Sequence, residues 1–248
     1  MPDLAALVPT FVALAILLAL TVAVLRGSRT PSFLAPAVAI LRGAAQLALI
    51  SLVLGGIIND PLWVAVALLV MFTVAVATAT RRLTWSWRRF AAVAATMALG
   101  ILVTLAVVFG TGAIEFTPRY VLAVGGIVIG NCMSIAVLAG RRFFEAVRDQ
   151  WSEVEGWLAL GAQPHRATLT QARFSVHAAL IPSIDQTKTT GLVTLPGAFV
   201  GAIFGGASPL EAGRFQVVVL ASIMAAGSIT AVALIRSLRS VKVRPEPL

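Results

Sequence analysis

The chain has 248 residues, of which 59% are apolar and only 12% are charged, and its mean hydropathy is +0.95. Soluble domains average roughly 45–50% apolar and about 25% charged residues, so the composition excludes a soluble protein and indicates an integral membrane protein. The net charge of +9 does not indicate nucleic-acid binding, because the basic residues lie in short groups between apolar runs.

Apolar runs long enough to cross a bilayer as helices, about 20 residues each, recur along the chain. They predict seven transmembrane helices, over residues 4–25, 36–58, 61–80, 91–110, 120–139, 184–206 and 214–235. The N-terminus lacks a basic region before its apolar run, so we expect the first helix to be retained rather than cleaved as a signal peptide. Pro61 follows Asn59 and Asp60, which predicts a tight turn with proline opening the third helix. The expected fold class is an all-α, polytopic membrane helix bundle.

Basic residues predict the orientation, because cytoplasmic loops retain lysine and arginine. With the N-terminus outside, sixteen of the 19 basic residues fall on the cytoplasmic side: Arg26, Arg29, Arg81, Arg82, Arg88, Arg89, Arg141, Arg142, Arg148, Arg166, Arg173, Lys188, Arg236, Arg239, Lys242 and Arg244. Arg119 and Arg214 fall outside, and Arg42 lies within a span. We therefore expect an N-out, C-in, multi-pass protein of the bacterial inner or plasma membrane.

One connection, residues 141–182, is long, and we expect it on the cytoplasmic side. Apolar residues recur there at helical spacing and predict an amphipathic helix: Phe144, Val147, Trp151, Val154 and Leu158. Gly161 is expected to end this helix, and Pro164 to open a second helix that returns to the membrane. The stripe fits either a helix lying on lipid headgroups or a docking element for a soluble partner.

The stretch SIDQTK, residues 183–188, is polar although an apolar run follows it. Ser183 and Gln186 have the form of a capping box, which predicts that a helix begins at Ser183. Asp185 would then lie in the first turn, and Lys188, three residues on, is expected to pair with it at the cytoplasmic mouth. Both a helix start and a gate at the mouth of a pathway fit these charges.

Pro196 lacks an N–H group, so the carbonyl of Leu192 loses its helical partner and the sixth span is expected to kink or open there. Freed backbone groups at membrane depth are tolerated only inside a bundle or beside a watery path. Gly197, Gly201 and Gly205 repeat at four-residue intervals, a pattern that predicts close packing against another helix.

Polar residues inside the other predicted spans are few. Arg42 lies in the second span, with Gln46 one helical turn further on the same face. An arginine at mid-membrane costs at least about 2.5–3.5 kcal/mol on insertion scales, so Arg42 should face the bundle interior or snorkel. It fits a structural role or a place in a pathway or gate. Asn131, in the fifth span, is expected to hydrogen-bond between helices, with substrate contact as the alternative.

Several segments resemble, in order, the Fet-type ABC permease family, whose bacterial members are associated with iron or metal export and plant members with aluminium tolerance. They are Arg42-Gly-Ala-Ala-Gln46, the GAIEFTP loop that ends at Pro118, Gly130-Asn131-Cys132-Met133, the Leu160-Gly161-Ala162 loop, and the stretch from Ala179 to Gln216. The resemblance implies a permease subunit of an exporter, with two copies of this chain and two copies of a separate ATPase subunit.

The segment EGWLALGAQPHRA, residues 155–167, is similar to the coupling loop of ABC permeases. The resemblance implies ATPase-coupling roles for Glu155, Leu160, Gly161 and Ala162. Pathway or gate roles are expected for Arg42, Gln46, Asn131, Asp185, Lys188, Pro196 and Gly197. The chain contains no P-loop motif, so ATP and magnesium are expected in the partner ATPase, and the chain itself is not expected to be an enzyme.

The sequence offers little for other chemistry. Cys132 is the only cysteine, which excludes an intramolecular disulfide and a cysteine-rich metal site, and His165 and His177 are expected to be solvated. An ion-coupled secondary transporter is the main alternative and would show internal repeats with paired broken helices. A membrane enzyme would need clustered carboxylates or histidines. The chain is treated as one permease domain over residues 1–248, containing the coupling segment 141–182.

Overall fold

The computed structural model describes residues 4–246, apart from the side chains of residues 4–7 and 52–57. In this part the chain is all-α, as expected, and has ten helices. Five helical segments are long and apolar enough to cross a membrane: Val8–Gly27, Pro61–Arg82, Trp87–Gly110, Pro118–Asp149 and Pro209–Leu238. The chain is therefore a multi-pass membrane protein. It divides into two compact units, Met1–Ile57 and Ile58–Leu248.

The first unit contains two helices, α1 (Leu4–Gly27) and α2 (Ala35–Ile57), which contact each other. Both agree closely with the helices predicted over 4–25 and 36–58. Their described side chains are mostly exposed and apolar, such as Phe11 and Leu47, which suits helices whose neighbours are lipid.

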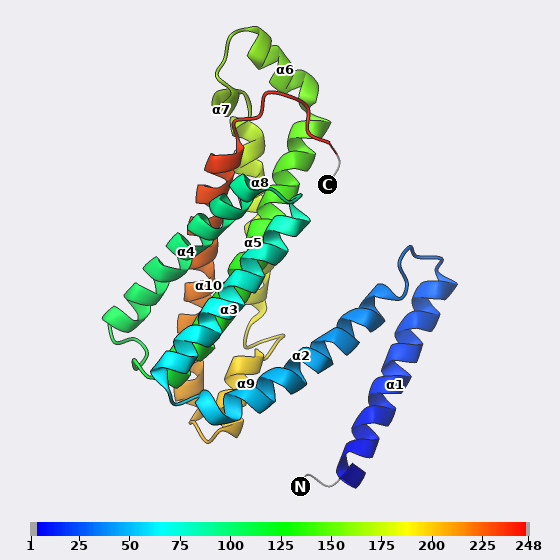
Figure 1. The fold of residues 1–248 in the computed structure, drawn as a ribbon, viewed down its shortest axis with the longest axis vertical. Coiled ribbons are helices and arrows are strands. Elements are labelled where there is room, and N and C mark those ends of the chain that lie inside the picture. Colours follow the sequence, from blue (N-terminus) through cyan, green and yellow to red (C-terminus); the bar gives the residue numbers. More distant parts are fainter. Residues whose placement is uncertain (1–3, 247–248) are drawn as a thin grey trace. The chain divides into compact units, whose positions relative to one another are not determined.

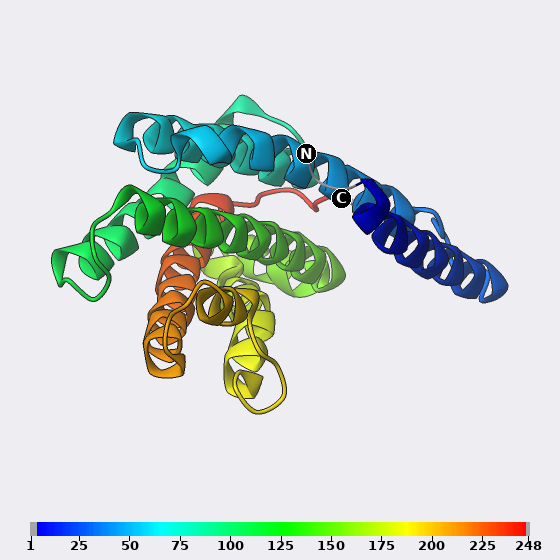
Figure 2. The ribbon, with the colours of Figure 1, turned by 90° about the horizontal axis from the view of Figure 1, so that it is seen from below.

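Four long helices form the core of the second unit: α3 (Pro61–Arg82), α4 (Trp87–Gly110), α5 (Pro118–Asp149) and α10 (Pro209–Leu238). They pack side by side, as Figures 1 and 2 show, with α10 against both α4 and α5 and with α3 against α5. Each contains one of the predicted helices 61–80, 91–110, 120–139 and 214–235. The structure extends α5 by ten residues beyond its predicted end, to Asp149.

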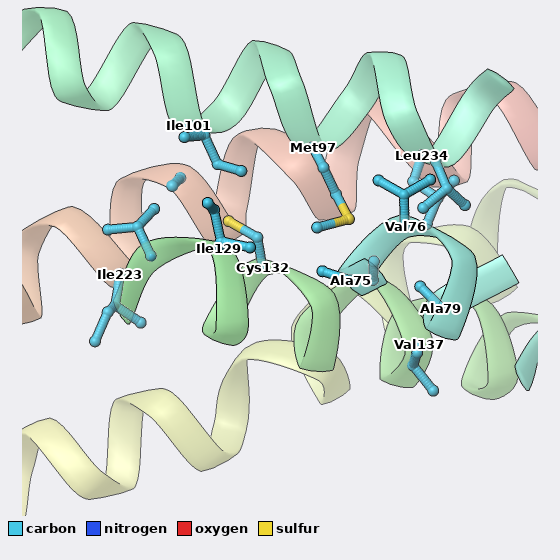
Figure 3. Close-up of a cluster of buried hydrophobic side chains, with 14 of the residues drawn as sticks. Ala75, Val76, Ala79, Met97, Ile101, Ile129, Cys132, Val137, Ile223 and Leu234 are labelled. Atoms are coloured by element: carbon cyan, nitrogen blue, oxygen red, sulfur yellow. The ribbon is translucent and has the colours of Figure 1, made fainter. Parts of the chain in front are cut away.

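Small apolar side chains fill the space between these four helices (Figure 3). They include Val76 and Ala79 of α3, Met97 of α4, Cys132 of α5 and Leu234 of α10, all at most 1% exposed. Because lipid is as apolar as these residues, the helices are held together by close packing rather than by removal of apolar surface from water.

Glycine permits the closest of these approaches. A Cβ atom at Gly100 of α4 would lie 2.5 Å from the carbonyl oxygen of Ala226 and 2.6 Å from Oγ1 of Thr230, both on α10. In the same layer, the Thr230 hydroxyl donates a 3.5 Å hydrogen bond to the carbonyl oxygen of Thr96 on α4. The backbones of α4 and α10 are therefore nearly in contact at mid-helix.

Side chains satisfy the free backbone groups where α3 and α10 begin. Oδ1 of Asp60 accepts a 2.8 Å hydrogen bond from the N–H group of Leu62, and Pro61 is the first residue of α3, as predicted. At α10, Ser208 Oγ accepts from the N–H group of Glu211 at 3.3 Å, while Glu211 Oε2 accepts from the N–H group of Ser208 at 3.0 Å. The chain's capping box thus lies at Ser208.

Four shorter elements connect α5 to α10: α6 (Trp151–Ala159), α7 (Pro164–Ala167), α8 (Leu169–Thr189) and α9 (Gly197–Phe204). In Figure 1, α6 and α7 lie at one end of the second unit and α9 at the other, beside the start of α10. The helix α8 packs along α5 and α10. This helix carries most of the polar residues that the sequence singled out.

The predicted sixth helix, over residues 184–206, is wrong. Helix α8 begins at Leu169, continues through Pro182 and ends at Thr189, and seven residues separate it from α9. Ser183 is therefore a buried residue inside a helix and not a helix cap. The local sequence resembled a helix start, but α8 already begins at Leu169, and near that end Gln171 Nε2 donates to Oε1 of Gln150, the residue between α5 and α6, at 2.9 Å.

Candidate functional site

A cleft of about 130 Å³ lies between α5 and α8. Its lining is Asn131, Ser134, Ile135 and Leu138 from α5, and Ala179, Pro182, Ser183 and Gln186 from α8. Each helix thus contributes two polar side chains. Of these four, Ser183 is buried, Asn131 is half-buried, and Ser134 and Gln186 are exposed. Polar groups in hydrocarbon are costly unless they find a partner, so a set of four facing one cleft is a candidate site.

The cleft lies at the middle of the membrane-spanning part of α5. Asn131 stands 12 residues after Arg119 and 10 before Arg141, the charged residues that bound the apolar stretch of α5. Its amide Nδ2 donates to the carbonyl oxygen of Ile127 in its own helix at 2.9 Å, so the predicted hydrogen bond between helices is not the one formed. The amide instead lines the cleft, where its oxygen can accept from a bound group.

Pro182 shapes the opposite wall. It lies within α8 and has no N–H group, so the carbonyl of Ala178 cannot receive the regular helical hydrogen bond there. Pro182 is exposed and Ser183 beside it is buried. A carbonyl without its helical partner is tolerated at this depth where the backbone lines a cavity, and Pro182 does line the cleft.

Asp185 and Lys188 flank Gln186 and form the ion pair that their spacing predicted. Lys188 Nζ lies 3.7 Å from Asp185 Oδ1, and the two side chains are 71% and 63% exposed. Their position differs from the prediction. The pair lies near the end of α8, next to Gln186, which shares the cleft with Asn131, and not in the first turn of a helix. The prediction misplaced it because it began the helix at Ser183, fourteen residues after the true start at Leu169.

Helix α8 ends in a row of threonines. The hydroxyls of Thr187, Thr189 and Thr190 donate to the carbonyl oxygens of Ser183, Asp185 and Gln186 at 2.8, 3.0 and 2.7 Å. Such bonds use each hydroxyl's only hydrogen and leave its lone pairs free to accept. The last turn of α8 therefore presents hydroxyl oxygens near the cleft and the ion pair.

The chain between α8 and α9 is broken rather than kinked. Gly191 has a φ of +88°, a left-handed conformation that ends the helix, and its N–H group donates to the carbonyl oxygen of Thr194 at 2.8 Å. Pro196 follows as the N-cap of α9, so the expected bend at Pro196 is replaced by a seven-residue gap. Leu192, 94% exposed, projects from this loop.

The glycines after Pro196 do not pack as expected within the chain. A Cβ at Gly197 or Gly201 would meet no other atom within 4 Å, and one at Gly205 would meet only carbonyl oxygens of α9 itself. Among the described residues, nothing covers this face of α9. The close helix approach occurs instead at Gly100, which its sequence context did not mark.

The expected coupling segment is an exposed turn between α6 and α7. Gly161 has a φ of +84°, its N–H group donates to the Leu158 carbonyl oxygen, and that of Ala162 donates to the Trp157 carbonyl oxygen, each at 3.0 Å. These two bonds are those of a Schellman motif, which ends a helix at a left-handed glycine. Glu155 and Leu160 are exposed, with Leu160 82% accessible, and Ala162 is half-buried.

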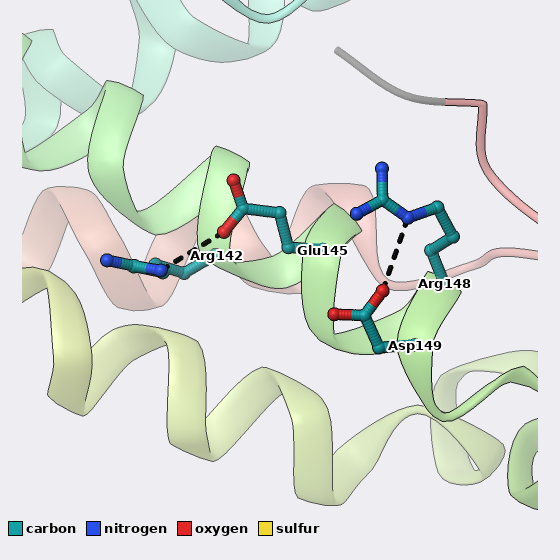
Figure 4. Close-up of polar contacts among 4 residues, drawn as sticks. All are labelled: Arg142, Glu145, Arg148 and Asp149. Carbon is teal, nitrogen blue, oxygen red and sulfur yellow. Dashed lines mark hydrogen bonds and ion pairs between the residues drawn. The ribbon is translucent and has the colours of Figure 1, made fainter. Parts of the chain in front are cut away.

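The apolar stripe behind this turn is buried in the protein. Val147 and Val154 are fully buried and Phe144 is 8% exposed, while Trp151 and Leu158 pack against the same cluster. The stripe is shared between α5 and α6, which meet at Gln150. It holds the turn against the bundle, so the outward residues of the turn are displayed on a fixed support. Ion pairs on the adjoining end of α5, Arg142 with Glu145 and Arg148 with Asp149, are shown in Figure 4.

The remaining site candidates are not among the residues that line the cleft. Arg42 and Gln46 are one turn apart on α2, in the first unit, and both are exposed there. His165 is half-buried in α7, and His177 is exposed on α8. Among the residues that the structure describes, no three His, Cys, Asp or Glu side chains are grouped to hold a metal ion.

Comparison with known proteins gives one family match. Residues 8–241 match the family described as "Uncharacterised protein family (UPF0014)". Among curated relatives, the chain is 40% identical over 196 residues to "UPF0014 membrane protein STAR2" of Oryza sativa subsp. japonica, covering 78% of this chain and 69% of the relative. It is 35% identical over 193 residues to "Protein ALUMINUM SENSITIVE 3" of Arabidopsis thaliana, covering 77% and 71%.

A bacterial relative matches over a shorter stretch. The chain is 36% identical over 140 residues to "Probable iron export permease protein FetB" of Escherichia coli (strain K12), covering 56% of this chain and 53% of the relative. No solved structure matches the chain. The resemblance that the motifs suggested is thereby confirmed at the level of the family.

Proposed function

Because this chain belongs to the UPF0014 family, we propose that it is the membrane-spanning permease subunit of an ABC exporter, driven by a separate ATPase subunit. The observation that supports this most directly is the broken α8–α9 segment, which carries polar and charged residues at the level of Asn131 beside a bundle of apolar helices. Interrupted helices at membrane depth supply the backbone and side-chain groups that a solute needs on its way across.

The α6–α7 turn is the proposed docking point for the ATPase. It is exposed, its conformation is fixed by the Schellman motif, and its supporting stripe is buried. Glu155, Leu160, Gly161 and Ala162 would contact the partner, which would hold ATP and magnesium. The turn is tied to the bundle through Val154, so movement of the partner would reach α5 and α8.

The proposed pathway runs through the α5–α8 cleft. Asn131, Ser134, Ser183 and Gln186 would contact the solute, with Asp185 and Lys188 as a gate whose pairing changes during transport. Pro196 and Gly197 would act as the hinge that begins α9. Arg42 and Gln46 are proposed as a second polar group on α2, contributing to the same pathway in the assembled transporter.

A second copy of this chain is the proposed partner within the membrane. The loop and α9 expose Leu192, Val193 and Phe204, and the glycine face of α9 is uncovered in the described chain. A smooth face of small residues is what another membrane helix can approach closely. The proposed assembly is two permease chains with two ATPase subunits.

An iron or other metal ion is the proposed solute, on the strength of the bacterial relative's name. Hard metal cations prefer oxygen ligands, and hydroxyl, amide and carboxylate oxygens are the groups gathered in and beside the cleft. The ion would be cargo, held by few groups at a time, which allows it to leave as well as to bind.

The test is reconstitution of the chain with its ATPase in proteoliposomes, measuring ATP hydrolysis and metal movement. Leu160→Asp should lower stimulated ATP hydrolysis roughly tenfold, a loss of about 1.4 kcal/mol of coupling, because a charge replaces an apolar docking contact. Leu210→Asp is the matched control, since Leu210 is 85% exposed but begins α10 at the other end of the unit. Equal loss in both variants, or metal transport driven by an ion gradient without the ATPase, would contradict the proposal and favour a secondary transporter.

A further inference from the structure

A second groove, of about 480 Å³, lies between α8 and α10 near the end of the unit that carries α7. Its lining is Leu169, Ala172, Arg173, Val176, His177 and Leu180 from α8, with Val232, Ile235 and Arg236 from α10 and Arg239 directly after it. The two helices are tied at this end, because the Thr168 hydroxyl donates to the carbonyl oxygen of Arg239 at 2.8 Å. The groove is therefore a fixed feature of the fold.

The groove combines an apolar floor with basic residues. Ala172 is 5% exposed and Ile235 is 2% exposed, so they form its base, while Val232, 36% exposed, forms part of its wall. Three arginines line it, Arg173, Arg236 and Arg239, and none of its described lining residues is acidic. A ligand with one anionic group and an adjoining apolar chain would complement both parts.

The three arginines have no protein partner in the described part of the chain. The ion pairs found there join Arg142 to Glu145, Arg148 to Asp149 and Lys188 to Asp185. No hydrogen bond of the guanidinium groups of Arg173, Arg236 or Arg239 is formed among the described residues either, although a guanidinium offers five donors. Three such groups on one groove repel one another, and an anion between them would relieve that repulsion.

The depth of the groove matches a lipid headgroup. Arg236 and Arg239 lie in and directly after the last turn of α10, the end of a membrane-spanning helix, while Val232 and Leu180 lie deeper. Phosphate groups of a bilayer lie at that boundary, with acyl chains below. Basic pockets between transmembrane helices are a known type of site for anionic lipid headgroups.

We propose that this groove binds an anionic phospholipid, with its phosphate against Arg173, Arg236 and Arg239 and one acyl chain along Val176, Leu180 and Val232. The apolar part of the groove distinguishes this ligand from free inorganic phosphate, which would use only the arginines. The site is separate from the α5–α8 cleft and does not depend on the identity of the transported solute. Bound lipid would join α8 to α10.

The test is native mass spectrometry of the purified full chain with phosphatidylglycerol, phosphatidylcholine or inorganic phosphate. Phosphatidylglycerol should bind at least roughly tenfold more tightly than the other two, and the triple variant R173Q/R236Q/R239Q should lose this preference. The matched control is R81Q/R82Q/R88Q, which removes three exposed charges from the adjoining ends of α3 and α4. It should change phosphatidylglycerol binding less than about twofold.

Two further variants keep the proposal testable if the glutamine variant fails to fold. The triple lysine variant R173K/R236K/R239K preserves the charge and should retain most of the binding. Val232→Trp fills the groove without changing charge and should weaken phosphatidylglycerol binding at least roughly fivefold, whereas an ionic surface effect would leave it unchanged. Equal binding of phosphate and phosphatidylglycerol, equal losses in both glutamine triples, or normal binding by Val232→Trp would each overturn the proposal.

Discussion

The four long helices of the second unit and the α8–α9 segment lie side by side but are built in different ways. In the bundle of α3, α4, α5 and α10, small apolar side chains pack tightly and a glycine brings α4 against α10. The end of α8 carries polar and charged residues, seven residues separate it from the apolar helix α9, and Gly197 and Gly201 of α9 contact no other element in the described chain.

This difference separates stability from transport. A tightly packed interface has one low-energy arrangement, and small changes in volume disturb it. The seven residues between α8 and α9, which lie outside any helix, open locally at less cost, which a moving element requires. Substitutions in the bundle should therefore act on folding, and substitutions in α8 and α9 should act on transport.

The largest effect is expected from Gly100→Leu. The new side chain would begin 2.5 Å from the carbonyl oxygen of Ala226, which is backbone and cannot rotate away. We expect the free energy of unfolding in detergent to fall by about 3 kcal/mol or more, at the upper end of overpacking effects. Gly130→Leu on α5 is the control, because a Cβ there meets nothing within 4 Å. Similar losses of unfolding free energy in both variants would show that the close approach of α4 to α10 does not determine the effect.

The second effect is on transport. Lys188→Met leaves Asp185 without its partner at the depth of Asn131, where an isolated charge is costly, and we expect transport in proteoliposomes to fall at least roughly tenfold. Arg142→Met is the control, since Arg142 forms a pair of the same spacing with Glu145 at the charged end of α5. It should alter transport less than about twofold, as exposed pairs contribute little.

The charge-swapped variant Asp185→Lys/Lys188→Asp distinguishes two roles of that pair. If the two charges only neutralise each other, the swapped variant should accumulate in the membrane and transport the solute as the unaltered chain does. If the pair is a gate that contacts the solute, the swapped variant should accumulate in the membrane but should not transport the solute. Normal transport by Lys188→Met alone would show that the pair serves neither purpose.

A smaller effect is expected from Pro196→Ala. Alanine supplies the N–H group that proline lacks and removes the ring that hinders a preceding helical turn. Helix α9 could therefore extend toward its N-terminus and stiffen the loop after Gly191. Transport should fall roughly fivefold, about 1 kcal/mol, while thermal stability is unchanged or raised. Pro209→Ala, at the start of the tightly packed α10, is the control and should leave transport unaltered. A transport rate of Pro196→Ala equal to that of the unaltered chain would show that the loop does not act as a hinge.

The smallest effect is expected from Gly201→Ala. Within one chain the added methyl group meets open space, and alanine favours a helix over glycine by up to about 1 kcal/mol, so stability of the isolated chain should not decrease. If a second copy covers this face, self-association measured by analytical ultracentrifugation should weaken several-fold. Unchanged association would place the interface between copies elsewhere.

The sequence predicted the bundle well because its signals are local and strong. Long apolar runs defined the cores of α3, α4, α5 and α10, and Asp60 with Pro61 marked a true helix start. Ser183 and Gln186 have the same pattern as a helix start. In the structure α8 begins well before them, and Gln171 near its start is held by a hydrogen bond to Gln150. The capping box at Ser208 has the same pattern, and sequence spacing alone could not rank the two.

The candidate site was predicted in its residues more than in its arrangement. Asp185, Lys188 and Asn131 were identified, and the ion pair forms. Ser134 was missed, and Gln186 was assigned only a capping role, because their shared cleft depends on how α8 aligns with α5. Glycine spacing was equally ambiguous, since close approach at Gly100 and its absence at Gly201 depend on which helix lies opposite.

The length of α5 has a mechanical consequence. Its 32 residues form one uninterrupted helix about 48 Å long, with Asn131 near its middle, and Gln150 directly after its end is the N-cap of α6. A continuous helix of this length can move as a rigid body. If the α6–α7 turn is pushed sideways, the outer end of α5 swings in the opposite direction about a pivot near the cleft. The helices around Asn131 would then slide past one another with little bending of α5. A small movement of the turn at one face of the membrane would therefore change the side of the membrane toward which the cleft opens.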